Sequence, residues 1–173
     1  MSQSDHPVWS VYDRLRSARL SVKYYCCQIE SAERKSFWLE LLLLVTAPSS
    51  AVAGLWFWDH EYGQVAWKLL AIPAAVAAIL KPLLHLTKKI KDYEAVISGY
   101  RMLEHDLLEI KIGIEQKRKY DAPLQTEFKR VQQRERILVG KNPEARENPK
   151  IKAICQAEVL RGLPTDSFFI PED

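Results

Sequence analysis

Two stretches decide the fold: FWLELLLLVTAPSSAVAGLWFW, residues Phe37–Trp58, and VAWKLLAIPAAVAAILKPLLHL, residues Val65–Leu86. Each window holds 22 residues with very few charges. A helix of that length measures about 33 Å, which is enough to cross a hydrocarbon layer of about 30 Å. The pattern predicts an all-α protein built around a transmembrane helix over 37–58, a short external loop over 59–64 and a second transmembrane helix over 65–86.

The basic residues around this hairpin predict its orientation. Six of them precede the first window and three follow the second, whereas the loop has none: Arg14, Arg16, Arg19, Lys23, Arg34, Lys35, Lys88, Lys89 and Lys91. Because Lys and Arg are retained on the cytoplasmic side of a membrane, we expect both termini in the cytoplasm.

Glu40 and Lys81 are charged residues inside the apolar windows. Counted from the loop, they lie at depths of about 28 Å and about 26 Å, which is nearly the same level. Because charges within a span usually face a partner or a water-filled cavity, the sharper hypothesis is an ion pair within or between hairpins. The alternative is that both side chains reach into the headgroups at the cytoplasmic edge.

Proline and small residues suggest how the windows pack. Each proline removes an intrahelical hydrogen bond and tends to kink its helix, so freed carbonyls need partners in lipid. Close packing of faces rich in small residues, mostly alanine, explains the pattern, and lining of a conduit by several copies is the alternative. His85, near the inner edge, is a candidate pH-sensitive group or a headgroup residue. The membrane or pore candidates are therefore Glu40, Pro48, Ser49, Ser50, Pro73, Lys81, Pro82 and His85.

Two amphipathic helices flank the hairpin on the cytoplasmic side. Residues 1–36 are predicted to contain an N-terminal helix, and residues 87–139 further helices. Apolar residues recur at alternating spacings of three and four, with a change of phase near Tyr100 in the second segment. We expect these stripes to pack against each other, or against copies of themselves, as a coiled-coil-like stalk. The proposed assembly stripe is Val11, Leu15, Ala18, Val22, Tyr25, Ile29, Ile90, Tyr93, Ile97, Tyr100, Leu103, Leu107, Ile110 and Ile114.

The segment after the stalk is predicted to end in a linker, a short helix and a tail over residues 140–173. A helix over about Ala122–Val139 has Pro123 in its first turn and Gly140 as its stop. Residues 141–149 are polar and bracketed by Asn-Pro pairs, which is typical of a linker. The tail residues Phe168, Phe169 and Ile170 are apolar, so they dock either on a partner or on the chain's own stalk.

The sequence gives no indication of enzymatic chemistry. It has no phosphate-binding glycine loop, and its four histidines lie in different segments. Adjacent Cys26 and Cys27 rarely satisfy disulfide geometry, so we expect reduced thiols with a structural role. The net charge of +3 is well mixed and does not favour direct nucleic-acid binding. We expect a non-enzyme without catalytic residues, cofactors or metal.

Two segments carry a resemblance to a known family. They are VWSVYDRLRSARLSVKYYCCQIESAERKSFW (residues 8–38) before the hairpin and IKDYEAVISGYRMLEHDLLEI (residues 90–110) after it. With the hairpin between them, Val8 to Glu115 resembles the SLATT-type two-transmembrane effectors of bacterial anti-phage, or abortive-infection, systems. The likeness lies in architecture and in a texture rich in Tyr and Arg, not in a catalytic motif.

The resemblance implies a multi-pass effector in the bacterial inner membrane. When triggered, such an effector oligomerises or rearranges and permeabilises or depolarises that membrane, which kills or arrests the cell. Because this chain has no sensor domain fused to it, triggering would come from a separately encoded sensor or nucleotide-signal-generating protein, or from a small ligand between the cytoplasmic helices. The alternative is a membrane-anchored scaffold that recruits a soluble partner through its cytoplasmic helices and tail.

Overall fold

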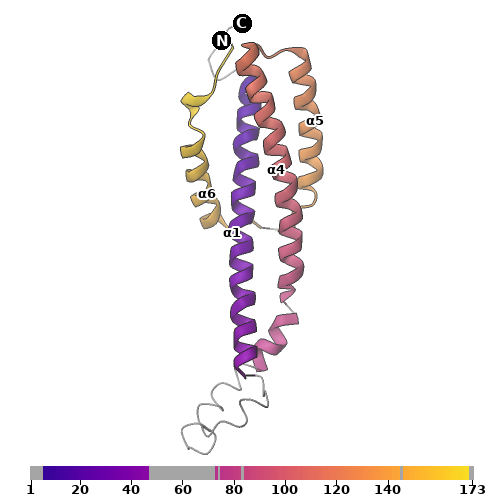
Figure 1. Ribbon diagram of the computed structural model, residues 1–173, viewed down its shortest axis with the longest axis vertical. Coiled ribbons are helices and arrows are strands. Elements are labelled where there is room, and N and C mark those ends of the chain that lie inside the picture. Colours follow the sequence, from indigo (N-terminus) through magenta and orange to yellow (C-terminus); the bar gives the residue numbers. More distant parts are fainter. Residues whose placement is uncertain (1–5, 47–72, 74, 83, 145, 172–173) are drawn as a thin grey trace, which may run out of the picture. The chain divides into compact units, whose positions relative to one another are not determined.

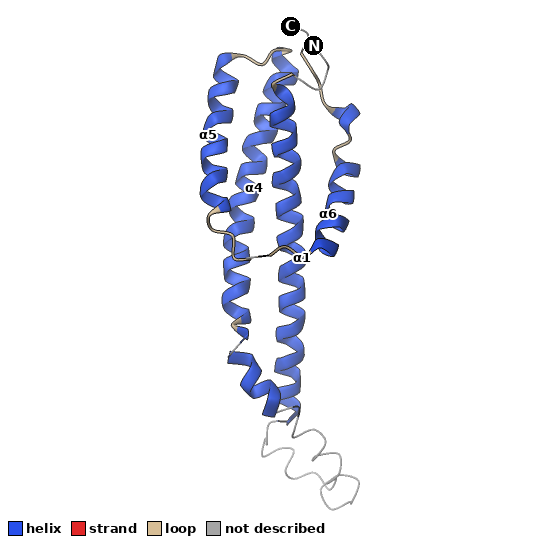
Figure 2. Cartoon of the chain, turned by 180° about the vertical axis from the view of Figure 1, so that it is seen from behind, coloured by secondary structure: helices blue, strands red, loops and turns tan. Residues whose placement is uncertain are grey.

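The computed structural model describes residues 6–46, 73, 75–82, 84–144 and 146–171. Within these ranges the chain is all-α and contains no strand, as the sequence predicts (Figure 2). The elements, labelled in Figure 1, are α1 (Val8–Thr46), α4 (Leu86–Lys117), α5 (Ala122–Val139), α6 (Pro149–Gly162) and the short 3-10 helix η3 (Thr165–Ser167).

The chain packs as two units. Unit 1 comprises Met1–Ile29 and Lys91–Asp173, and unit 2 comprises Glu30–Ile90. Helices α1 and α4 contribute to both units, so each of these helices has one part in each unit. Because the units are compact by themselves, we describe them separately.

Unit 1 is a helical bundle in which α1 is the central element. Helices α4 and α5 lie on one side of α1, and α6 with the C-terminal tail lies on the other (Figure 1). This position explains why α1 buries more than one stripe of side chains. The core includes Val8, Val11, Tyr12, Leu15, Ala18, Tyr24, Tyr25, Tyr93, Val96, Ile97, Tyr100, Leu103, Leu107, Ile110, Ile114, Leu124, Phe128, Val131, Leu163 and Phe168.

The ends of α5 and α6 follow ordinary capping chemistry. The Asp121 side chain accepts a hydrogen bond from the Leu124 amide at 3.2 Å, and the Asn148 side chain accepts one from the Lys150 amide at 3.1 Å. A proline occupies the first turn of each helix, where its missing N–H costs nothing. Gly140 ends α5. The bounds predicted for the Ala122–Val139 helix are confirmed.

Helix α5 packs antiparallel on α4 with leucines set against glycines. A Cβ added at Gly99 would lie 2.3 Å from a methyl of Leu138, and one at Gly113 would lie 2.9 Å from a methyl of Leu124. The glycines are 14 residues apart on α4 and the leucines 14 residues apart, in reverse order, on α5. The close approach therefore repeats at both ends of the contact.

Ion pairs tie α1 to each of the other three helices. Arg14 pairs with Glu135 of α5. Arg19 Nε lies 2.6 Å from Glu104 Oε1 of α4, and Lys23 Nζ lies 2.6 Å from Glu158 Oε2 of α6. Such partly exposed pairs contribute little stability individually, but they fix which residues of neighbouring helices face each other.

Unit 2 contains the last part of α1, the helical residues 75–82, and the beginning of α4. His85 has a φ of 45°, in the left-handed region, and separates the preceding helical residues from α4. The Lys89 amide donates to the His85 carbonyl at 3.0 Å, which starts the hydrogen-bond ladder of α4. The helical residues 75–82 and α4 are therefore separate helices.

No helix is both long enough and apolar enough to cross a bilayer among the residues described. Helix α1 covers the first window only from Phe37 to Thr46. The loop over 59–64, residues 47–58 of the first predicted span and residues 65–72, 74 and 83 of the second lie outside the described residues.

Candidate functional site

Glu40 and Lys81, from different apolar windows, form an ion pair. Lys81 Nζ lies 3.5 Å from Glu40 Oε1, and the Ser36 hydroxyl donates to the same carboxylate oxygen at 3.3 Å. The side chains are 47% and 56% exposed, respectively. The sharper hypothesis, an ion pair within or between hairpins, agrees with this geometry, and the pair observed lies within one chain. The pair joins α1 to the helical residues 75–82 within unit 2.

Large apolar side chains around this pair are exposed rather than buried. A T-shaped contact joins the rings of Phe37 and Trp38, with centroids 5.9 Å apart. Burial of apolar surface normally drives helix packing in water, so apolar residues on the outside of paired helices need another covering. Among the described residues, the exposed large apolar side chains of the two windows are Phe37, Trp38, Leu44, Val76, Ile79, Leu80 and Leu84.

Of the other pore candidates, the structure describes Pro73, Pro82 and His85. Pro48, Ser49 and Ser50 lie outside the described residues. Pro73 and Pro82 are exposed. His85 is also exposed and lies where the helical conformation is interrupted before α4.

The assembly stripe is covered within a single chain. Most of its residues are buried in the core of unit 1, and Val22 and Ile29 are partly buried against that core. Ile90, in unit 2, is also partly buried. Of the two expected arrangements, the structure shows the stripes packed against each other within one chain. The stripe has a partner already, because α1 and α4 bury it against each other, α5, α6 and the tail.

A tyrosine cluster joins α1, α4 and the α5–α6 linker. The Tyr24 and Tyr93 hydroxyls donate to the two carboxylate oxygens of Glu144, at 2.5 Å and 2.7 Å. The Tyr24 oxygen also accepts from the Gln28 side chain and from the Asn148 amide, both at 2.8 Å. One hydroxyl thus connects α1 to the first turn of α6.

A pocket of about 240 Å³ lies beside this cluster. Tyr25 and Tyr100, with ring centroids 6.1 Å apart, form part of its wall, and Lys152 and Glu147 pair at its edge. Burial is the main cause that raises the pKa of the Tyr100 hydroxyl, followed by the charges of nearby glutamates. The hydroxyls therefore stay protonated at neutral pH and act as neutral hydrogen-bonding groups.

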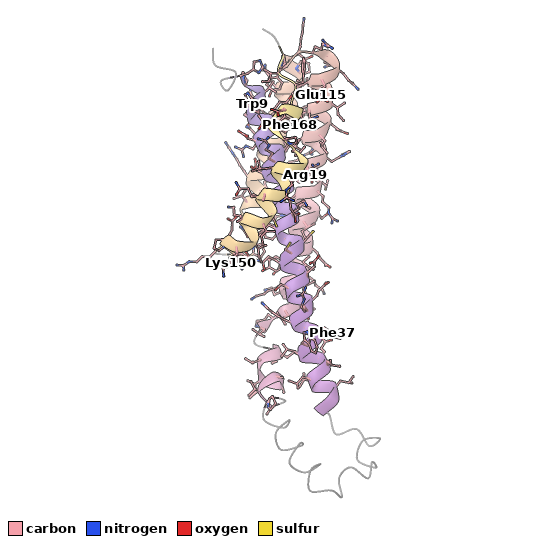
Figure 3. All side chains as sticks on the ribbon, turned by 90° about the vertical axis from the view of Figure 1, so that its left-hand side faces the viewer. Trp9, Arg19, Phe37, Glu115, Lys150 and Phe168 are labelled. Carbon is pink, nitrogen blue, oxygen red and sulfur yellow. The ribbon has the colours of Figure 1, made fainter. Side chains whose placement is uncertain are left out.

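The apolar tail docks on the chain's own α1. The Phe168 ring stacks on Tyr12 with centroids 4.2 Å apart and meets Trp9 edge-on at 6.2 Å. Figure 3 shows the labelled Trp9 and Phe168 side by side near the start of α1. Arg16 donates to the Leu163 carbonyl at 2.8 Å and lies over the Phe168 ring at 4.8 Å. Of the two docking alternatives, the structure shows the intramolecular one.

Three features of unit 1 have only weak signals in the sequence. Tyr12 and Tyr24 lie outside the heptad stripe, and their burial depends on the late segments α6 and tail. Cys27 lies close to Cys155, which is 128 positions away.

Within the described part of the chain, no group of three or more His, Cys, Asp or Glu side chains is placed to hold a metal ion.

No family model, curated protein or solved structure matches this chain. The resemblance of Val8 to Glu115 to the SLATT-type effectors therefore stays a prediction.

Proposed function

We propose that this chain is a membrane effector of a bacterial anti-phage defence system. It resides in the inner membrane as a multi-pass protein with both termini in the cytoplasm. When a sensor triggers it, it oligomerises through its apolar hairpin and permeabilises or depolarises the membrane, which leads to cell death or growth arrest. The bilayer, further copies of the chain and a separately encoded sensor or signal-generating protein are its partners.

The observation that carries this proposal is the exposed apolar surface around the Glu40–Lys81 pair. Seven large apolar side chains of the two windows are exposed among the described residues. Lipid chains contact such a surface at little cost in free energy, whereas its exposure to water is unfavourable. Four exposed basic residues border the two windows: Arg34 and Lys35 before the first window, and Lys88 and Lys89 after the second. Basic residues are expected at this boundary because the cytoplasmic surface of the membrane is anionic.

The ion pair supports a role at the edge of the apolar layer. A carboxylate and an ammonium entering a hydrocarbon layer cost less together than separately, because each neutralises the other. The pair holds α1 and the second window at one level. When hairpins rearrange, Glu40 of one copy is able to pair with Lys81 of another copy. The state before triggering and the assembled oligomer then contain the same kind of ion pair.

The intramolecular burial of the stripe changes how assembly would be controlled. Because the stripe is buried within unit 1, we infer that copies meet through the windows rather than through the stripe. We infer that the cytoplasmic bundle acts as the regulatory part and the hairpin as the membrane-active part. The docked tail similarly removes the apolar residues on which a scaffold function would depend.

The experiment is expression of the full chain in a bacterial host, with membrane fractionation and a potential-sensitive dye as readouts. We expect the chain in the inner-membrane fraction and loss of potential on overexpression. Glu40→Lys alone and Lys81→Glu alone should change the extent of depolarisation, because each places like charges together, and the double reversal should restore it.

Reversal of the Lys152–Glu147 pair is the matched control, because its side chains are 43% and 47% exposed and it lies in unit 1. This control should leave depolarisation unchanged. A chain that stays in the soluble fraction, or that inserts and leaves the potential intact at every expression level, would refute the proposal.

A further inference from the structure

Cys27 of α1 and Cys155 of α6 form a close thiol pair. Their Sγ atoms are 3.9 Å apart, although 128 positions separate them in the sequence. Both are free thiols; Cys155 is 2% exposed and Cys27 is partly exposed. A disulfide requires the sulfur atoms to come about 2 Å closer, to the bond length of about 2 Å.

The neighbouring contacts hold this pair in register. Lys23 lies four residues before Cys27, and Glu158 lies three residues after Cys155, so each shares a helix face with its cysteine. The Lys23–Glu158 ion pair, at 2.6 Å, therefore fixes the same two faces against each other. Cys26, which points in another direction on α1, packs against the hydrophobic core instead.

We propose that Cys27 and Cys155 form a reversible disulfide when the protein meets a peroxide-class oxidant, a modification site that covalently fixes α6 to α1. Disulfides in reducing compartments are mostly transient and redox-sensing, which fits two unbonded thiols at this distance. The site does not depend on the proposed membrane activity, because its product is a bond within unit 1.

The two thiols have different parts in the reaction. Burial, followed by the contact with Cys27, raises the pKa of the Cys155 thiol to about 11, so Cys155 stays protonated at neutral pH. Cys27, the more accessible sulfur, attacks one peroxide oxygen; the O–O bond breaks and leaves a Cys27 sulfenic acid and one water. The Cys155 sulfur then attacks the sulfenic sulfur, and the sulfenic hydroxyl leaves with the Cys155 proton as a second water.

The electron balance is complete with the peroxide as the only co-reactant. Two thiols lose two electrons, and one hydrogen peroxide accepts them to give two waters. A thiol reductant reverses the bond by exchange. While it persists, the bond ties α6 to α1 and prevents the linker, α6 and tail from leaving the bundle together.

The test is oxidation of the full chain in detergent micelles with hydrogen peroxide, followed by trypsin digestion and mass spectrometry without reductant. Cleavage at Lys and Arg releases Cys27 in the peptide of residues 24–34 and Cys155 in the peptide of residues 153–161. We expect these two peptides joined as one species, two hydrogen atoms lighter than their sum, and separated again by a thiol reductant.

Cys26→Ser is the matched control, because it removes the adjacent thiol from the same peptide. The joined species should persist in Cys26→Ser and be absent from Cys27→Ser and Cys155→Ser. In Cys155→Ser, a sulfenic-acid trap such as dimedone should label Cys27, and circular dichroism should show unchanged helicity. Joining through Cys26, disulfides only between chains, or oxidation of Cys27 beyond sulfenic acid without joining would each overturn the proposal.

Discussion

Replacement of Gly99 by alanine sets two opposite effects against each other. Alanine inside a helix is favoured over glycine by about 1 kcal/mol. The new Cβ, however, would lie 2.3 Å from one Leu138 methyl and 3.3 Å from the other methyl and from Cγ. Because the whole branched end of Leu138 has to move, an overpacking cost of about 1 to 3 kcal/mol applies. We expect Gly99→Ala to destabilise the α4–α5 contact by up to about 2 kcal/mol.

The same substitution should change sign once Leu138 is removed. In a Leu138→Ala background, the clash is absent, so Gly99→Ala should stabilise by about 1 kcal/mol, and the double-mutant cycle should give a coupling of about 1 to 3 kcal/mol. Hydrogen exchange of α5 amides in the full chain, in detergent micelles, measures these free energies. Gly162→Ala, with nothing within 4 Å of its added Cβ, is the control. Equal stabilisation by Gly99→Ala in both backgrounds would refute the close approach.

Three further predictions concern α1. Tyr24→Phe should lower the opening free energy at the start of α6 by about 1 to 3 kcal/mol, measured by hydrogen exchange, because the Asn148 N–H loses its acceptor. Arg16→Ala should speed limited proteolysis of residues 163–171, with Arg16→Lys intermediate; unchanged cleavage would contradict the Arg16 contacts. Burial, followed by the Glu115 charge, raises the pKa of Tyr12 from 10.0 to about 12, so the unfolded chain loses this proton first. Stability from this group is complete below pH 10 and falls from pH 10 to 12, and Tyr12→Phe should flatten that fall in denaturant titrations.

Local signals were sufficient to predict several elements. The heptad stripe before the first window predicts a long helix, and α1 is continuous over 39 residues. The bounds of α5 follow from Pro123 and Gly140, because capping residues act within one turn. The Glu40–Lys81 pair could be predicted because both residues can be counted from one loop.

Contacts between distant segments could not be predicted in this way. The stripe predicts a buried face, but burial looks the same in sequence whether a neighbouring helix or another copy covers it. Tyr12, Cys27 and Glu144 acquire their partners only through the return of α6 and the linker, and no periodicity encodes that return. A third charge in the windows, Lys68, lies outside the described residues and makes their charge pattern more than a single matched pair.

The stacking of Phe168 on Tyr12 has a consequence for synthesis. The Tyr12 hydroxyl bonds to a carbonyl made 157 positions later. At translation rates of about 5 to 20 residues per second, the start of α1 waits roughly 8 to 30 s for this last partner. Until the tail is synthesised, Phe168 is therefore absent from the aromatic face of Trp9 and Tyr12. A chain released before the tail is made exposes this aromatic patch to chaperones and proteases.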